Sequence, residues 1–205
     1  MTKFMSEMDV TTHFRRVLEE ATGENFVSLK SKKGEGRAWE TDGVLQWESP
    51  NKTSVKLLLE TKFGTDLTKS KVRSSVLAQT LYYCKKFKER GDLIPNVIFI
   101  GDENHCFALS FASVEAFLEA EIDWGRAPSS PDPSLSIDLD VHLESTLGVD
   151  AVKLKGLCEQ LAEGCVQKVR PCGGNLSAMY QYWTDHILPK NTYTPVEMVD
   201  VFYSC

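Results

Sequence analysis

Residues 54–63 read Ser-Val-Lys-Leu-Leu-Leu-Glu-Thr-Lys-Phe, and this stretch decides the fold class. Its uninterrupted apolar run, Leu57 to Leu59, is typical of a strand buried on both faces, and therefore of a central strand. Residues 40–47, Glu-Thr-Asp-Gly-Val-Leu-Gln-Trp, are interpreted as its partner strand, because Ser49-Pro50-Asn51-Lys52 has the composition of a turn. Together the two segments predict a buried hairpin.

The turn also predicts which residues of the hairpin face each other. With Asn51 at its centre, paired residues have numbers that add up to 102, so Asp42 lies opposite Glu60. Directly opposed side chains point to the same face with Cβ atoms ~5 Å apart, and Lys62, two residues beyond Glu60, shares that face. Because a slip of one residue would separate them, this register predicts two carboxylates and one ammonium group at one end of the hairpin.

This constellation suits metal-dependent phosphoryl chemistry. Two carboxylates this close repel each other unless a cation lies between them, and hard oxygen ligands suit Mg²⁺ or Mn²⁺. Such an ion polarises a phosphorus centre and helps to form hydroxide, while a neighbouring lysine can orient or deprotonate the water. The alternative is a surface cluster of Asp42, Glu60 and Lys62 that makes ordinary cross-strand ion pairs.

The segments around the hairpin predict an α/β fold with a central mixed sheet flanked by helices. They follow one another in the order helix, strand, strand, strand, helix, strand. Their expected bounds are Asp9–Ala21, Phe26–Leu29, 40–47, 54–63, 69–90 and 96–101. Cys106–Leu109 is expected to add an edge strand, and Val114–Glu121 a short helix.

Composition indicates a soluble globular protein. Hydrophobic residues make up 42% and charged residues 25% of the 205 residues, the usual proportions for a chain of one domain, or one domain with an appendage. No apolar run is long enough to span a bilayer, and the first residues lack the apolar segment of a secretory signal. We therefore expect a cytoplasmic protein with no membrane partner.

The net charge of −6 conceals an uneven distribution. Residues 1–90 contain 17 Lys and Arg against 12 Asp and Glu, whereas residues 91–205 contain 6 against 17. Such asymmetry favours a polyanion, such as nucleic acid, as the partner of the first half. A solvated basic helix face is the alternative.

Asp42 and the later Glu60-Thr61-Lys62, at the end of an apolar strand, resemble the motif of the PD-(D/E)xK nuclease superfamily. The expected element order resembles the αβββαβ core of that superfamily, the restriction-endonuclease-like fold. Gln79-Thr80-Leu81-Tyr82-Tyr83 resembles the QxxxY signature of its RecB-like branch. The resemblance covers roughly residues 9–101, and it departs from the name-giving motif at Thr41, where that motif has Pro.

The resemblance implies a role for each matching position. Asp42 and Glu60 would be ligands of Mg²⁺ or Mn²⁺. The main-chain carbonyl of Thr61 would be a further ligand, and Lys62 would act on the attacking water.

Gln79 and Tyr83 would line the site, where they contact the DNA backbone or support the catalytic residues. A helical wheel agrees, because Val72, Val76, Gln79 and Tyr83 fall within one narrow sector of the expected helix. A glutamine on that sector faces inward and needs a partner. The alternative is a Gln79 side chain that caps the backbone of a nearby strand.

Many members of the superfamily also have a glutamate on the first helix. The apolar stripe of that helix consists of Phe14, Val17, Leu18 and Ala21. Glu20 flanks the stripe and Glu19 points nearly opposite, so Glu20 is the expected additional metal ligand. A solvated Glu20 is the alternative.

Basic residues on both sides of the carboxylates are candidates for phosphate contacts. Lys30, Lys32, Lys33 and Arg37 precede Asp42, and Lys69, Lys71 and Arg73 follow Lys62. For each of them taken alone, a solvated surface cation is the favoured alternative.

These observations predict a Mg²⁺-dependent endonuclease domain over residues 1–126 that hydrolyses DNA phosphodiester bonds. Residues 127–205, which begin with the Pro- and Ser-rich segment Ala127–Ser134, are expected to form a linker and a helical extension. By analogy with restriction enzymes, the partners would be a second copy or a helicase or methyltransferase module. The alternatives are a catalytically inactive nuclease-fold module that binds nucleic acid or another partner, and a purely structural interaction domain.

Overall fold

The computed structural model describes residues 4–31, 38–92, 94–126, 128–135, 137 and 141–169, with side chains described up to residue 164. The chain divides into two compact units, of which the first runs through Cys165. The second, Val166–Cys205, lies outside the described residues except for the end of one helix.

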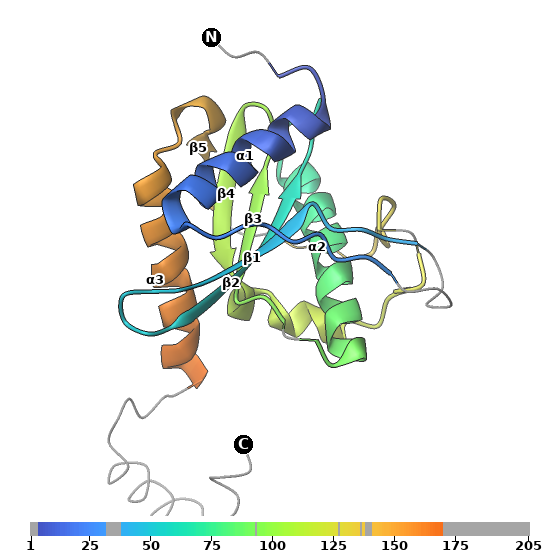
Figure 1. Cartoon of the computed structure of the whole chain (residues 1–205). Coiled ribbons are helices and arrows are strands. Elements are labelled where there is room, and N and C mark those ends of the chain that lie inside the picture. Colours follow the sequence, from blue (N-terminus) through green and yellow to red (C-terminus); the bar gives the residue numbers. More distant parts are fainter. Residues whose placement is uncertain are drawn as a thin grey trace, which may run out of the picture. The chain divides into compact units, whose positions relative to one another are not determined.

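A five-stranded mixed sheet forms the centre of the described part of the chain (Figure 1). Its strands are β1 (Gly43–Glu48), β2 (Ser54–Thr61), β3 (Val97–Gly101), β4 (His105–Ser110) and β5 (Glu144–Ser145). They lie side by side in numerical order, with β2 and β3 parallel and the other neighbours antiparallel. The expected central position of β2 is confirmed, since it lies between β1 and β3.

The register expected for the hairpin is confirmed. Gly43 pairs with Leu59, and Trp47 pairs with Val55, which is the pairing that a turn centred on Asn51 requires. The amide of Ser49 donates to the carbonyl of Thr53 at 2.9 Å and closes this turn.

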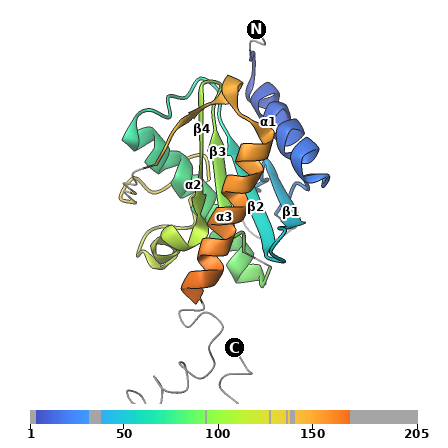
Figure 2. The same ribbon diagram turned by 90° about the vertical axis from the view of Figure 1, so that its left-hand side faces the viewer.

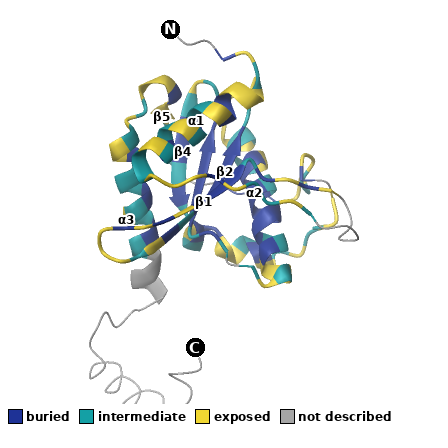
Figure 3. Ribbon diagram, in the orientation of Figure 1, coloured by how far each residue is buried: buried dark blue, intermediate teal, exposed yellow. Residues whose placement is uncertain are grey.

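Helices cover both faces of the sheet. They are α1 (Glu7–Thr22), α2 (Ser70–Arg90) and α3 (Ala151–Val169). Because side chains alternate along a strand, Leu58 and Ile100 pack with α2, whereas Leu57 and Phe99 pack with α1 and α3. Figure 2 shows α2 on one side of the sheet and α1 on the other, and Figure 3 shows the central strands coloured as buried between them.

One of the local expectations is wrong, and two others differ in detail. Phe26–Leu29 forms no regular strand, because the β-pairing of this stretch and its surroundings is limited to the isolated bridges Val27↔Val44 and Lys30↔Glu40. The short helix expected over Val114–Glu121 is present as a 3₁₀ helix, Glu115–Glu119. Helix α1 begins two residues earlier than expected, at Glu7, because the Ser6 hydroxyl caps it by accepting from the amide of Asp9 at 3.2 Å.

The described residues between 128 and 165 belong to the same compact unit as the residues before them. Leu154, Cys158 and Ala162 of α3 are buried in the core that α1 shares with the sheet. Trp47 Nε1 also donates to Glu159 at 3.1 Å. The helices expected at 175–188 and 195–203 lie outside the described residues.

None of the helices in the described part of the chain combines the length and the apolar composition that crossing a membrane requires.

Candidate functional site

The predicted constellation lies where β2 ends. Glu60 and Thr61 are the last residues of β2, Lys62 follows them, and Asp42 directly precedes β1. The ladder between β1 and β2 runs to Gly43 and Leu59, so the next pair along the same register is Asp42 and Glu60. The structure therefore brings the three predicted side chains to one end of the sheet.

Asp42 is held in place by Thr61. Its Oδ2 atom accepts from the amide of Thr61 at 2.6 Å and from the Thr61 hydroxyl at 2.7 Å. The Thr61 hydroxyl also lies 2.6 Å from the hydroxyl of Thr11 on α1. Hydrogen bonds to a carboxylate restrain both its position and its direction, so Asp42 is oriented by β2 and by the first helix together.

Glu60 and Lys62 form a largely buried ion pair. The Glu60 side chain is 2% exposed and the Lys62 side chain 19%, and Lys62 Nζ lies 2.5 Å from Glu60 Oε1. Burial raises the pKa of Glu60 to about 8; Lys62 opposes this shift, while Asp42 and Glu7 add to it. Burial alone lowers the pKa of Lys62, but Glu60, Glu7 and Asp42 outweigh it, and the pKa rises.

The glutamate of the first helix that approaches this pair is Glu7, not Glu20. Glu7 Oε1 lies 3.9 Å from Lys62 Nζ. Glu20 is exposed in the last turn of α1, about 20 Å further along the helix axis at 1.5 Å per residue. The helical wheel that favoured Glu20 gives the direction in which a side chain points but not its position along the helix axis. It also left out Glu7, because the helix was expected to begin at Asp9 and the first turn depends on the Ser6 cap.

Helix α2 provides another wall of the site. Gln79 Nε2 lies 3.1 Å from the hydroxyl oxygen of Tyr83, so the inward-facing Gln79 has a side-chain partner on its own helix. Burial raises the pKa of the buried Tyr83 phenol, and the carboxylates of Glu60 and Asp42 raise it further. The two residues of the QxxxY-like pattern are therefore joined, and Tyr83 lies within electrostatic reach of both carboxylates.

The basic candidates are not equally available for phosphate contacts. Arg73 donates to the carbonyls of Leu67 and Thr68, both at 2.9 Å, and so stabilises the loop before α2. Lys69 is paired with Asp66 at 3.2 Å, whereas Lys71 is exposed.

The candidates before β1 are less informative. Lys30 pairs with Glu40 at 2.9 Å. Lys32, Lys33 and Arg37 lie outside the described residues.

A divalent cation fits the donor set in chemistry and in charge. Three carboxylates interact here, those of Asp42, Glu60 and Glu7, against the single ammonium group of Lys62. The ionised site therefore has excess negative charge. Mg²⁺ is commonly bound by one or two carboxylates together with waters, and Asp42 and Glu60 would supply two carboxylates. No cluster of three or more His, Cys, Asp or Glu suited to a metal occurs in the part of the chain that the structure describes.

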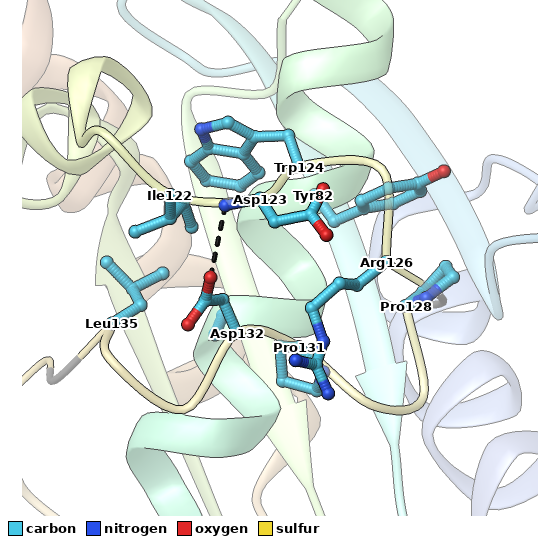
Figure 4. Close-up of a pocket in the computed structure, with 10 residues that line it drawn as sticks. Tyr82, Ile122, Asp123, Trp124, Arg126, Pro128, Pro131, Asp132 and Leu135 are labelled. Atoms are coloured by element: carbon cyan, nitrogen blue, oxygen red, sulfur yellow. Dashed lines mark hydrogen bonds between the residues drawn. The ribbon is translucent and has the colours of Figure 1, made fainter.

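A pocket on the outer side of α2 provides no competing site. It lies between α2 and residues 122–135, next to Tyr82 and Trp124, and the amide of Asp123 donates to Asp132 across it at 3.1 Å (Figure 4). Its volume of about 10 Å³ is roughly the space of a single water. It is too small for a substrate.

Comparisons with protein-family models, with curated proteins and with solved structures yield no match to this chain.

Proposed function

We propose that this chain is a divalent-metal-dependent nuclease that hydrolyses DNA phosphodiester bonds, with a restriction-endonuclease-like core of the PD-(D/E)xK type. One observation carries the proposal. The buried Glu60 carboxylate is paired with Lys62 and flanked by Asp42 at the end of a central strand.

Burial argues against the alternative of an ordinary surface cluster. Exposed ion pairs contribute little and need no particular environment. A carboxylate that is 2% exposed is costly unless its charge is compensated, and here two further carboxylates add to the negative charge. A site with this excess charge is suited to a cation that arrives with the substrate or before it.

The arrangement of elements is also compatible with the proposed core. Helix α1, the β1–β2 hairpin, helix α2 and strand β3 follow one another as the αβββαβ order requires, apart from the weakly paired stretch around Val27. Because β2 and β3 are parallel, their carboxyl ends meet at the same edge of the sheet. That edge is where Glu60 and Lys62 lie.

In the proposed reaction, Asp42, Glu60 and the carbonyl of Thr61 would hold Mg²⁺ or Mn²⁺, which supplies positive charge to the phosphate when bound. The ammonium group of Lys62, held by Glu60, orients the attacking water. The water oxygen forms a bond to phosphorus as one ester P–O bond breaks, and the proton that the water loses passes through solvent to the leaving oxygen. Gln79 and Tyr83 donate hydrogen bonds toward the substrate backbone or maintain the positions of the carboxylates.

Cleavage assays on the Lys62→Met variant test this proposal. We expect DNA cleavage in Mg²⁺ or Mn²⁺ to fall about 100-fold or more, the range in which a group acting on the water contributes. The fold should persist, because a buried Glu60 without its ammonium partner takes up a proton, and circular dichroism checks this. Lys153→Met, a change of an exposed lysine on α3, is the matched control. Cleavage by Lys62→Met at the wild-type rate would contradict the proposed role.

One observation favours a second candidate function. Lys62 already supplies a counter-charge to Glu60 in the absence of a metal, as it would in a nuclease-fold module that only binds nucleic acid. Such a module would bind DNA with the same affinity in EDTA as in Mn²⁺ and would not cut it. In the nuclease, cutting both strands of a duplex requires two sites, and therefore a second copy or an associated module.

A further inference from the structure

Two buried threonine hydroxyls connect helix α1 to Asp42. Thr11 and Thr61 are both buried, and their hydroxyl oxygens lie 2.6 Å apart. Thr61 Oγ1 also lies 2.7 Å from Asp42 Oδ2, and Thr11 Oγ1 lies 2.9 Å from the main-chain carbonyl oxygen of Glu7, one helical turn earlier. Three short oxygen contacts therefore form one continuous chain from Glu7 through the two threonines to Asp42.

This chain of contacts has fewer protons than contacts. Each threonine hydroxyl has one proton to donate, whereas the Glu7 carbonyl and the Asp42 carboxylate can only accept. If Thr11 donated to Glu7 and Thr61 donated to Asp42, no proton would lie between the two threonines, and oxygens 2.6 Å apart repel each other without one. One contact of the three must therefore do without a proton, and the contact between the threonines is not that one.

The contact that lacks a proton is the one to the carbonyl of Glu7. It is the longest of the three, at 2.9 Å, and inside an α-helix this carbonyl already accepts the main-chain amide four residues later. The contact to Asp42 keeps its proton, because a hydrogen bond to a charged carboxylate is the stronger kind. Thr11 therefore donates to Thr61 and Thr61 donates to Asp42, and consecutive hydrogen bonds in one direction strengthen each other.

The same reasoning identifies the oxygen of Asp42 that remains for a cation. Oδ2 accepts from the amide of Thr61 at 2.6 Å and from its hydroxyl, and two donors fill the lone pairs of one carboxylate oxygen. Oδ1 accepts no hydrogen bond from the residues that the structure describes. Asp42 thus has the lone pairs of Oδ1 available for an ion.

We propose that Thr11 is a positioning residue of the metal site: its hydroxyl directs the proton of Thr61 onto Oδ2 of Asp42, which leaves Oδ1 as the atom that binds the cation. This inference rests on the proposed nuclease function, because it requires an ion at Asp42. Residues that hold a metal ligand by hydrogen bonds orient it, and their loss lowers metal affinity about 10- to 100-fold. The effect of Thr11 on the ion passes through Thr61.

Calorimetric titration of the whole chain with Mn²⁺ tests this role. Thr61→Val, which keeps the shape of the side chain without its hydroxyl, should weaken Mn²⁺ binding about 10-fold. Thr11→Val should weaken it about threefold or more, because the proton of Thr61 is then free to turn away from Asp42. Thr11→Ser and Thr61→Ser, which keep the hydroxyl, should bind Mn²⁺ as tightly as wild type. The matched control is Thr80→Val, which should not change Mn²⁺ affinity, because the buried Thr80 hydroxyl donates within α2, to the carbonyl of Val76 at 2.9 Å.

A double-mutant cycle distinguishes an effect through Thr61 from an independent one. Thr11→Val added to Thr61→Val should weaken Mn²⁺ binding no further, because the chain of donations is already broken. Thr11→Ala, which lacks the hydroxyl and suits a helix, should repeat the loss seen in Thr11→Val, and urea denaturation checks that each variant is folded. Wild-type Mn²⁺ affinity in Thr11→Val, or an equal further loss in the double variant, would overturn the positioning role and leave the metal site standing. If the wild type shows no saturable Mn²⁺ binding, the metal site of the proposed function fails and this inference fails with it.

Discussion

Glu60 is the residue on which the electrostatics of the site depend. Its carboxylate is buried, and the surrounding charges are two more carboxylates and one ammonium group. Sequence alone predicted the meeting of Asp42, Glu60 and Lys62, because strand periodicity and a short turn determine pairing to the residue. Glu7 was missed because its position depends on where α1 starts and on how that helix lies across the end of β2, and both are tertiary properties.

Glu7 and Glu20 form a matched pair on one helix. Glu7→Gln should weaken Mn²⁺ binding about fivefold, because removing a unit charge that acts on the site from a largely solvated position costs about 1 kcal/mol. Glu20→Gln should leave Mn²⁺ affinity unchanged. Isothermal titration calorimetry measures both, and the opposite ranking would mean that Glu20 is the helix residue that matters.

Helix α1 approaches the sheet more closely than a side chain at position 101 would permit. A Cβ atom on Gly101 would lie 2.3 Å from Cε2 of Phe14, so the ring or the helix would have to move. Helix α1 positions Thr11 and Glu7 at the site, and this contact therefore connects the packing of an element to the geometry of the proposed chemistry.

Gly101→Ala should lower the free energy of unfolding by about 1–3 kcal/mol, as overpacking of a core does. Gly156→Ala is the control: nothing lies within 4 Å of a Cβ there, and alanine in the interior of α3 should stabilise by about 0.5–1 kcal/mol. Urea denaturation measures both. Equal stability of Gly101→Ala and wild type would show that the Phe14 ring can move aside without an energetic cost.

The elements differ in how far the sequence predicted them. Strands β2 and β3 and helix α2 are long and strongly patterned, so their existence followed from composition and period. The stretch around Val27 is short, and Val27 itself is exposed, so its β-branched and aromatic residues do not produce a ladder. The residue pattern of a short segment does not show whether a neighbouring strand pairs with it along its whole length.

At the scale of the whole molecule, the described part of the acidic second half, up to Cys165, belongs to the same compact unit as the first half. Helix α3 accepts hydrogen bonds from the β1–β2 hairpin at two glutamates, Glu159 from Trp47 and Glu163 from Asn51. Two of the acidic residues that lower the net charge therefore stabilise the hairpin that carries Asp42. The Pro- and Ser-rich segment suggested a boundary, but composition alone could not show that the chain returns to the same core.

The net charge of −6 means that weak, nonspecific binding of divalent cations must be separated from binding at the site. The most direct test is calorimetric titration of the whole chain with Mn²⁺, in wild type, Glu60→Gln and the exposed control Glu20→Gln. The account predicts one saturable Mn²⁺ per chain in wild type and in Glu20→Gln, and its loss in Glu60→Gln. The same saturable binding in Glu60→Gln as in wild type would contradict it.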